Sequence, residues 1–206
     1  MAPLTMRTVR RAPDRLQLMD NRDPWLFETE RLILRPWDRR IDLDDAFRIY
    51  SDPEVLRYIG GEARRIKNRD EMLVRLDSVM KVRPDGLGRW AMERKRERRV
   101  IGTVVLQHVH EGFAEPLDEI EIGWHLARDS WGQGYAAEAA RELLRHGFDT
   151  LGIGEILAIL GTENRASARV AQRIGMKRMG EADRYYGTTT EWYRLTAPEY
   201  RSGAPS

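Results

Sequence analysis

One stretch of this 206-residue chain constrains its fold more than any other: a strand that runs through a glycine-bearing turn into a helix, within residues 121–139. The turn itself reads Trp131-Gly-Gln-Gly-Tyr135. Two glycines, Gly132 and Gly134, let backbone N–H groups converge without obstruction by side chains. The helix N-terminus behind them adds unpaired donors and a partial positive charge. The sequence therefore predicts a binding site for phosphate or pyrophosphate that needs no lysine.

The same turn formally fits the dinucleotide fingerprint, as Gly132-x-Gly134-x-x-Ala137. Three observations weigh against a dinucleotide-binding domain. The motif lies past the middle of the chain, the preceding strand (119–126) is too polar to be buried on both faces, and the acidic residue expected about twenty positions on, Glu155, begins the next strand instead of ending it. No Walker motif is present. A plain strand–helix turn with small residues is the remaining interpretation from these residues alone.

Composition excludes several classes of protein. The first 24 residues hold five Arg and three Asp, and the 35 basic and 33 acidic residues of the chain therefore leave 30 of each sign in residues 25–206. Residues 25–206 therefore have no formal net charge, and net charge cannot explain what they bind. The absence of cysteine excludes disulfides, thiolate zinc sites and a thiol nucleophile. Apolar runs are far shorter than the roughly 20 residues of a membrane helix, and no apolar segment follows the early arginines. We therefore expect a cytoplasmic protein that binds neither membranes nor nucleic acid.

Apolar periodicity predicts a mixed α/β domain around one sheet, in the order β-α-α-β-β-β-α-β-α-β. The expected strands are 30–35, 89–93, 100–106, 119–126, 155–160 and 191–196, and the expected helices are 42–50, 68–82, 135–151 and 166–174. The charged segment 94–99 is interpreted as a solvated hairpin turn, since Glu97 interrupts its basic residues. Residues 1–25 are expected to form a basic arm, flexible or draped over the body, followed by the domain at 26–197 and a C-terminal tail at 198–206.

Several motifs together give the chain a resemblance to the GNAT acetyltransferase superfamily, and within it to the Rim-type (RimJ/RimL-like) enzymes that acetylate ribosomal-protein N-termini. The similar segments are Thr29-Glu-Arg-Leu-Ile-Leu-Arg-Pro-Trp37, Ile101-Gly-Thr-Val104, Glu121-Ile-Gly-Trp124, the turn with its helix to Ala139, Asn164-x-x-Ser167-x-x-Val170 and Ile174-Gly-Met176. The general loop of the superfamily is Q/R-x-x-G-x-G/A, and this chain departs from it by having Trp131 at the first position. The resemblance implies a single domain with a mixed, mostly antiparallel central sheet, splayed strands and about four flanking helices.

The resemblance also implies transfer of an acetyl group from acetyl-coenzyme A to an amine, without a metal. The loop would hold the pyrophosphate through N–H groups between Gly132 and Ala136, and Arg169 or Arg173 would be candidates to reach the phosphates. The strand that ends at Leu126 would splay from strand 155–160 and offer backbone groups to the pantetheine amides. The residues expected to contact the cofactor are Leu126, Trp131, Gly132, Gln133, Gly134, Tyr135, Ala136, Asn164 and Ser167.

Aminolysis of a thioester needs a base for the amine, a donor for the oxyanion and a group that serves the departing thiolate. Glu119 and Glu121 share one face of their strand, and Glu121, nearer the expected acetyl end, is our first candidate for the base. Both would merely be solvated if that face were an outer one. His125 lies on the same face and is a weaker candidate. Ser167 could donate to the sulfur, and Asn164 could bond the pantetheine arm, although helix capping explains this pair equally well.

Other residues receive lesser roles. Tyr185 and Tyr186 are expected near the acceptor, with packing the role of at least one, and residues 58–61 would form the opposite wall. Glu138 is expected to be a first-turn helix acid. The spacing of His108 and His110 indicates ordinary strand or loop residues and no metal site. A non-catalytic acyl-CoA-binding regulator and, more remotely, a dinucleotide oxidoreductase are the alternatives. The acceptor, whether protein N-terminus or small-molecule amine, stays open, as does the oligomeric state, although similar proteins are often homodimers.

Overall fold

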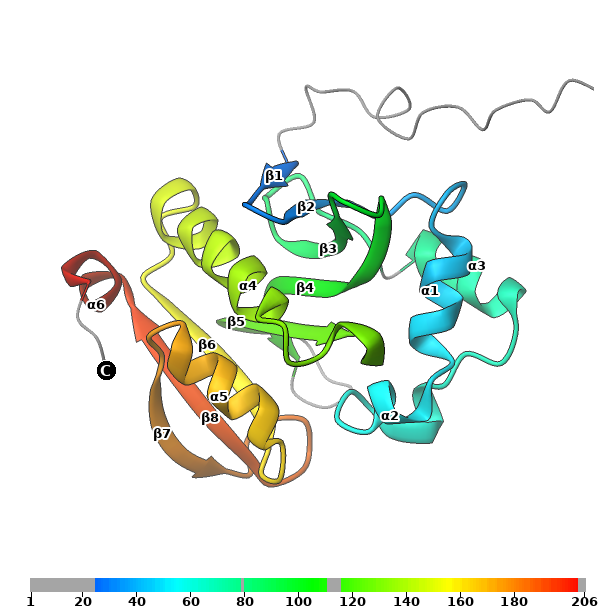
Figure 1. The fold of residues 1–206 in the computed structure, drawn as a ribbon. Helices are drawn as coiled ribbons and strands as arrows, with labels where there is room; N and C mark the ends of the chain where they lie inside the picture. The colour runs from blue at the N-terminus through cyan, green and yellow to red at the C-terminus, as the bar shows by residue number, and fades with distance from the viewer. Residues whose placement is uncertain (1–24, 79, 111–115, 204–206) are drawn as a thin grey trace, which may run out of the picture.

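The structure, a computed structural model, describes residues 25–78, 80–110 and 116–203. Eight strands form one sheet in the order β1-β2-β3-β4-β5-β6-β8-β7 (Figure 1). Their bounds are β1 Phe27–Glu28, β2 Leu32–Pro36, β3 Gly88–Arg94, β4 Arg99–His110, β5 Pro116–Leu126, β6 Glu155–Gly161, β7 Lys177–Ala182 and β8 Thr190–Thr196. All neighbouring strands are antiparallel except β5 and β6, which are parallel. The mixed, mostly antiparallel sheet expected from the sequence is confirmed.

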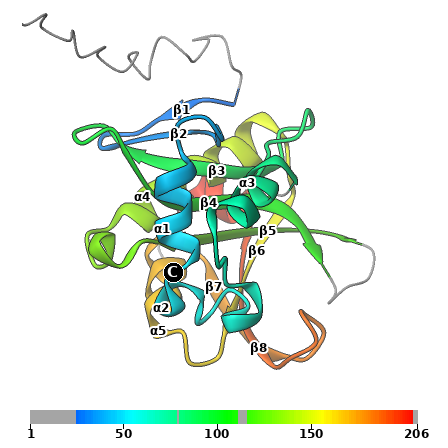
Figure 2. The same ribbon diagram turned by 90° about the vertical axis from the view of Figure 1, so that its right-hand side faces the viewer.

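Helices cover both faces of the sheet. They are α1 Leu43–Tyr50, α2 Pro53–Leu56, α3 Arg69–Ser78, α4 Tyr135–Arg145, α5 Arg165–Arg173 and α6 Ala197–Ser202, with short 3-10 turns at Gly61–Arg64 and Arg128–Ser130. Figure 1 shows α4 in front of β4 and β5, and Figure 2 brings α1 and α3 to the viewer. One buried cluster joins the sheet to α4 and α5, and a second joins it to α1 and α3.

Helix α4 approaches the sheet closely because the face that it buries consists largely of alanines. The chain then continues in a π-helical turn, His146–Thr150. Within this turn a Cβ on Gly147 would lie only 2.7 Å from Cδ1 of Ile156 on β6. The helix predicted over 135–151 is confirmed to Thr150, with a last turn that is π-helical. Helix α3 is shorter than the predicted 68–82.

Two short helices, α2 and α6, and two strands, β1 and β7, are additional to the prediction. In α2, the Asp52 side chain accepts a hydrogen bond from the backbone N–H of Glu54, and Pro53 occupies the first turn. In α6, Thr196 and Glu199 form a reciprocal capping box. Strand β7 pairs with β8 at the sheet edge. Because Tyr200 on α6 stacks on Phe148, at 4.8 Å between ring centroids, residues 197–202 belong to the folded body and not to the tail expected from residue 198.

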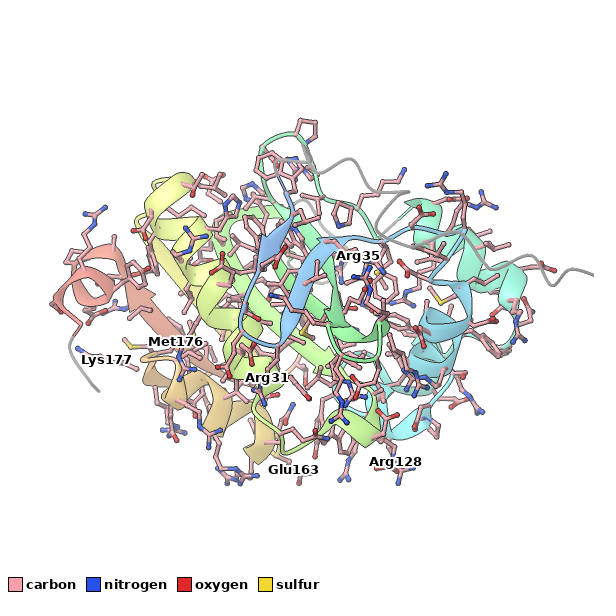
Figure 3. All side chains as sticks on the ribbon, turned by 45° about the horizontal axis from the view of Figure 1, so that its top comes forward. Arg31, Arg35, Arg128, Glu163, Met176 and Lys177 are labelled. Carbon is pink, nitrogen blue, oxygen red and sulfur yellow. The ribbon has the colours of Figure 1, made fainter. Side chains whose placement is uncertain are left out.

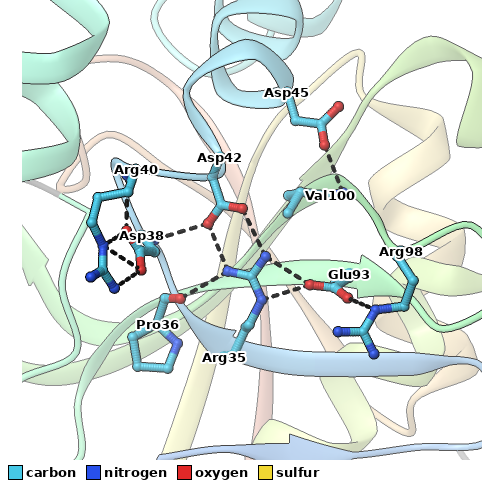
Figure 4. Close-up of polar contacts among 9 residues, drawn as sticks. All are labelled: Arg35, Pro36, Asp38, Arg40, Asp42, Asp45, Glu93, Arg98 and Val100. Carbon is cyan, nitrogen blue, oxygen red and sulfur yellow. Dashed lines mark hydrogen bonds and ion pairs between the residues drawn. The ribbon is translucent and has the colours of Figure 1, made fainter. Parts of the chain in front are cut away.

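A buried arginine joins β2, β3 and the start of α1 (Figure 4). Arg35 is fully buried and donates through its two terminal nitrogens to Asp42, at 2.6 and 2.7 Å, and through Nε to Glu93, at 2.8 Å. Glu93 also pairs with Arg98 at 2.8 Å. The charge that is taken out of water is therefore balanced by hydrogen-bonded partners. Within the described ranges no helix has the length and apolar composition needed to cross a membrane.

The arm expected at residues 1–25 lies outside the described residues except for Trp25, whose carbonyl accepts a hydrogen bond from the Trp90 indole at 2.8 Å.

Candidate active site

The turn between β5 and α4 forms an open cradle of backbone donors. Gly132 and Gly134 have φ angles of 72° and 84°, in the left-handed region that favours glycine. A Cβ on Gly132 would meet no atom within 4 Å, and one on Gly134 only Nη2 of Arg31 at 3.5 Å. Across the described part of the chain, no acceptor takes a hydrogen bond from the N–H groups of residues 132–137. Unpaired donors at a helix N-terminus attract an anion.

A carboxylate on the helix anchors this cradle to the first strands. Glu138 accepts hydrogen bonds from the Thr29 hydroxyl at 2.6 Å and from the backbone N and Nε of Arg31 at 2.8 and 2.6 Å. Arg31 also donates to the Gln133 carbonyl at 3.0 Å and lies over the Tyr135 ring. Burial opposes ionisation of Glu138, but the bonds from Thr29 and Arg31 outweigh it and lower its pKa. Glu138 is thus a positioning residue as well as a helix acid.

Trp131, which replaces the usual Gln or Arg, fixes the turn from its other side. Its indole N–H donates to the Leu126 carbonyl at 2.8 Å, while 46% of the residue stays exposed. Gln133 donates from its side chain to the Asp129 carbonyl at 2.9 Å. Leu126, expected to bind the pantetheine arm, therefore already has a hydrogen bond on its carbonyl oxygen. Tyr135 and Ala136 are buried and contribute only backbone to the cradle.

Strands β5 and β6 separate beside the cradle. They pair only at Ile120–Ile156 and Glu121–Leu157, so residues 122–126 of β5 have no partner on β6. Figure 3 shows Arg128, just after β5, and Glu163, just after β6, at the same edge of the molecule. The splay predicted for these strands is confirmed. It leaves an open sheet edge to which an extended chain with amide groups can add.

Glu121 occupies the last paired position before the strands separate. Only 7% of the residue is exposed. Its carboxylate accepts hydrogen bonds from the Tyr186 hydroxyl and from Nε2 of Gln107, the latter at 2.8 Å. Burial and the neighbouring charge of Glu121 raise the pKa of Tyr186, so its phenol stays protonated. Glu121 is therefore a buried carboxylate with a fixed orientation.

Glu119, one step earlier on the same face, has different surroundings. It forms an ion pair with Arg184, with 31% of its side chain exposed, and accepts a weak hydrogen bond from Tyr185 at 3.4 Å. Tyr185 itself is buried in a small cluster with Val109 and Leu157. Packing is thus the role of Tyr185, as expected for one of the two tyrosines, while Tyr186 reaches the candidate base. This geometry favours Glu121 over Glu119.

His125 lies on the far side of Gly123 from Glu121 and is held by α1. Its Nε2 is 2.5 Å from the Tyr50 hydroxyl, which is also 2.6 Å from the hydroxyl of Thr103. Burial, with a smaller contribution from Arg89 and Arg75, lowers the pKa of His125 to about 3. The imidazole is consequently neutral at physiological pH and too weakly basic to accept the proton of an ammonium group.

Asn164 and Ser167 lie at the start of α5, directly after β6. Oδ1 of Asn164 accepts a hydrogen bond from the Ser167 backbone N–H at 3.1 Å, which is helix capping. The Ser167 hydroxyl has no hydrogen bond to any described residue. Tyr58 faces the end of β6 from α2's side, since a Cβ on Gly161 would lie 3.5 Å from its ring. The role of residues 58–61 as the opposite wall of the acceptor site stays a prediction.

Sequence reasoning missed three contributors to this site: Tyr50, Gln107 and Arg89. Tyr50 and Arg89 belong to elements distant from β5 in the sequence, and nothing local marks them. Gln107 had a usable signal, because it lies opposite Glu121 once the β4–β5 hairpin is put in register. Among the described residues no three His, Asp or Glu side chains are grouped closely enough to hold a metal ion.

An α/β domain with an anion-binding turn beside two splayed strands defines a class of acyl-transferring proteins, and comparisons with known proteins agree. Residues 31–177 match the acetyltransferase (GNAT) domain family, and the chain belongs to that family. Family members use acetyl-CoA as the acetyl donor, and the chain is an acyltransferase.

Individual relatives cover most of the chain. The uncharacterized N-acetyltransferase YoaA of Bacillus subtilis is 29% identical over 160 residues, 78% of this chain and 87% of the relative. YkkB, an uncharacterized protein of the same organism, is 32% identical over 150 residues, 72% of this chain and 83% of the relative. A GNAT acetyltransferase structure from Bacillus anthracis superposes with a TM-score of 0.68 at 25% identity, covering 84% of this chain and 99% of that one.

Proposed function

We propose that this protein transfers the acetyl group of acetyl-CoA to a primary amine, of a protein N-terminus or a small molecule, with Glu121 as the general base. The observation that carries the proposal is a buried, oriented carboxylate where β5 and β6 separate, on the strand whose far end leads into the N–H cradle. The N–H groups of residues 132–136 would hold the pyrophosphate, and the open edge of β5 would pair with the pantetheine amides.

In the proposed reaction, the amine nitrogen forms a bond to the thioester carbonyl carbon, and the carbon–sulfur bond breaks. Glu121 accepts the proton that the nitrogen loses, either directly or through a water molecule. Tyr186 and Gln107 keep the carboxylate aimed at that position. The Ser167 hydroxyl, which is free to rotate toward the splay, is our candidate to donate to the departing thiolate. The products are the N-acetylated amine and CoA.

Two further resemblances support an acetyl-CoA-dependent reaction on nitrogen. A ribosomal-protein-S5-alanine acetyltransferase from Vibrio fischeri shares the fold, with a TM-score of 0.61 at 20% identity. An Aspergillus fumigatus protein named FsC-acetyl coenzyme A-N(2)-transacetylase is 34% identical over 97 residues, 39% of this chain and 41% of that protein. The Rim-type assignment and a cytoplasmic location remain part of the proposal, as does a homodimer.

The test measures CoA release with a panel of amines and peptide N-termini in the wild type and two variants. Glu121→Gln removes the base but keeps the shape and should lower kcat by about 10²–10³, within the usual contribution of general base catalysis. Glu119→Gln removes the charge paired with Arg184. This variant tests the alternative that Glu119, and not Glu121, is the general base. A larger loss in Glu119→Gln than in Glu121→Gln would overturn our choice of base, and saturable acetyl-CoA binding with no transfer to any amine would contradict the proposed activity.

A further inference from the structure

Three arginines from different elements converge on the sheet face that carries Glu121. They are Arg64 at the end of the 3-10 turn after α2, Arg75 on α3 and Arg89 on β3. Burial lowers the pKa of Arg75, and the positive charges of Arg89 and Arg64 lower it further. The positive charge of Arg89 also has a lowering effect on the pKa values of Tyr50, His125 and Tyr186. The positive charge of Arg89 thus lies near both His125 and Tyr186, the hydrogen-bond partner of Glu121.

The sheet register places Arg89 in one cross-strand row with Gly123. Arg89 lies opposite Val105 on β4, and Val105 lies opposite Gly123 on β5. Gly123 separates Glu121 from His125 on the same face of β5, and a Cβ there would meet only Cβ of Val105, at 3.9 Å. Gly123 thus leaves an open position in this row, while Val105 beside it is buried. Glu121 lies along one side of the row, and the arginine stands at its end, about two strand spacings from Gly123 or roughly 10 Å.

These arginines lack acidic partners. In the described ranges, none of the three forms an ion pair with a carboxylate. Arg75 has only the Arg64 carbonyl, at 3.3 Å, and the Tyr50 ring, 4.8 Å from its guanidinium carbon, and its Nε is buried without a hydrogen bond. The two nearby carboxylates are occupied, Glu121 by Tyr186 and Gln107, and Glu119 by Arg184. The three arginines outnumber the carboxylate of Glu121, whose partners Tyr186 and Gln107 are uncharged, so the described side chains give this face a net positive charge.

We propose that the acetyl acceptor is an amine that also carries an oxyanion, a carboxylate or a phosphate, and that Arg89 and Arg75 bind this oxyanion while the amine lies over Gly123 beside Glu121. The guanidinium fork matches both oxyanions in geometry. The inference rests on the proposed function and narrows its substrate class. A plain alkyl amine or polyamine has no oxyanion that these arginines could bind.

The experiment compares matched amines at saturating acetyl-CoA. L-amino acids and their amides differ only in the carboxylate, and 2-aminoethyl phosphate and ethanolamine differ only in the phosphate. The anionic member of at least one pair should have a kcat/KM about tenfold or more above the neutral member, as expected for charged hydrogen bonds. The pair that shows this preference identifies the oxyanion. Equal or better use of the neutral members in both pairs would overturn the proposal.

Variants of the arginines test whether they cause the preference for anionic acceptors. Arg89→Gln should raise KM for the anionic acceptor about tenfold, a larger change than it causes in KM for the neutral amine, and Arg89→Lys should restore part of the loss. The control Arg201→Gln removes an equal charge from α6, where the residue is exposed and remote from this face. A preference that survives both Arg89→Gln and the double variant with Arg75→Gln would overturn the assignment.

Calorimetric binding of the same probes to the CoA-bound protein separates this inference from the proposed function. If no amine is acetylated by the wild type, the transferase proposal fails. In that case, weaker binding of an anionic probe to Arg89→Gln than to the wild type would still support the oxyanion site, and equal binding would overturn it.

Discussion

At the scale of single residues, Arg35 is the side chain on which the N-terminal half of the domain depends most. Replacing it with alanine would leave Asp42 and Glu93 buried without their partner. Removing one member of a buried pair costs about 3–5 kcal/mol of unfolding free energy. We therefore expect Arg35→Ala to lower stability by about that amount in urea denaturation.

The matched control for this prediction is Arg39→Ala, which breaks an ion pair with Asp77 whose side chains are each about half exposed. Its cost should stay below about 1 kcal/mol. Similar losses in the two variants would show that the buried network contributes no more than a surface pair.

His125 should make the stability of the protein sensitive to acid. Its pKa is about 3 in the folded protein, whereas the unfolded chain has the ordinary value near 6.5. Below pH 6.5 the unfolded state therefore binds the extra proton, and stability falls by up to about 1.4 kcal/mol per pH unit as the pH drops toward 3. Comparing urea denaturation of the wild type with that of His125→Gln at pH 7, 6 and 5 measures this component. Identical pH slopes would contradict it.

The site could be predicted from the sequence only as far as its residues are local. The turn at 131–136 and the two glutamates on one face of β5 are adjacent in sequence, so spacing alone suggested them. Which glutamate is buried depends on Tyr186 and Arg184, which arrive from the β7–β8 connection. Contacts of this kind depend on how distant elements pack, and no local pattern records them.

At the scale of elements, substitutions in the glycine turn can distinguish an effect on acetyl-CoA binding from an effect on stability. Gly134 and Gly175 both have positive φ angles, 84° and 89°, and a Cβ would fit sterically at each. Alanine at either position should cost about 1–2 kcal/mol of unfolding free energy, because L-residues are strained there. Only Gly134→Ala places its methyl group inside the N–H cradle, and we expect acetyl-CoA binding to weaken about tenfold, equal to roughly 1.4 kcal/mol.

Titration calorimetry on both variants provides the comparison, with Gly175→Ala as the control for lost stability. If the two variants bind acetyl-CoA equally well, the turn does not hold the phosphates.

Elements with a strong apolar period were predictable, and the others were not. The β3–β4 hairpin, α1 and the start of α4 follow from their patterns, since each buries one regular face. Strand β7 was missed because its side chains are mostly exposed and a register shift between Arg178 and Gly180 interrupts its alternation. The π-helical geometry after α4 was not predicted, because the apolar stripe continues unchanged through that turn.

At the scale of the whole molecule, the sheet consists of two antiparallel groups, β1–β5 and β6–β8–β7, which share only two residue pairs. The neutral charge of residues 25–206 is compatible with binding anions, since the cradle and the arginine cluster act locally. The core beneath α4 and α5 spans both groups and keeps them together. The donor would bind along the line where the groups meet.

The line where β5 and β6 meet, which we call the seam, has a consequence for the resistance of the protein to proteolysis. Segments joined by few hydrogen bonds open first in native-state fluctuations, so those amides of residues 122–126 that face the open edge, and not β4, should exchange with solvent faster than the amides of β3 and β4. A donor bound across the seam at 100 times its Kd would add about 2.7 kcal/mol to the free energy of opening. Resistance to proteolysis at this place in the sheet should then be higher with the donor bound than without it.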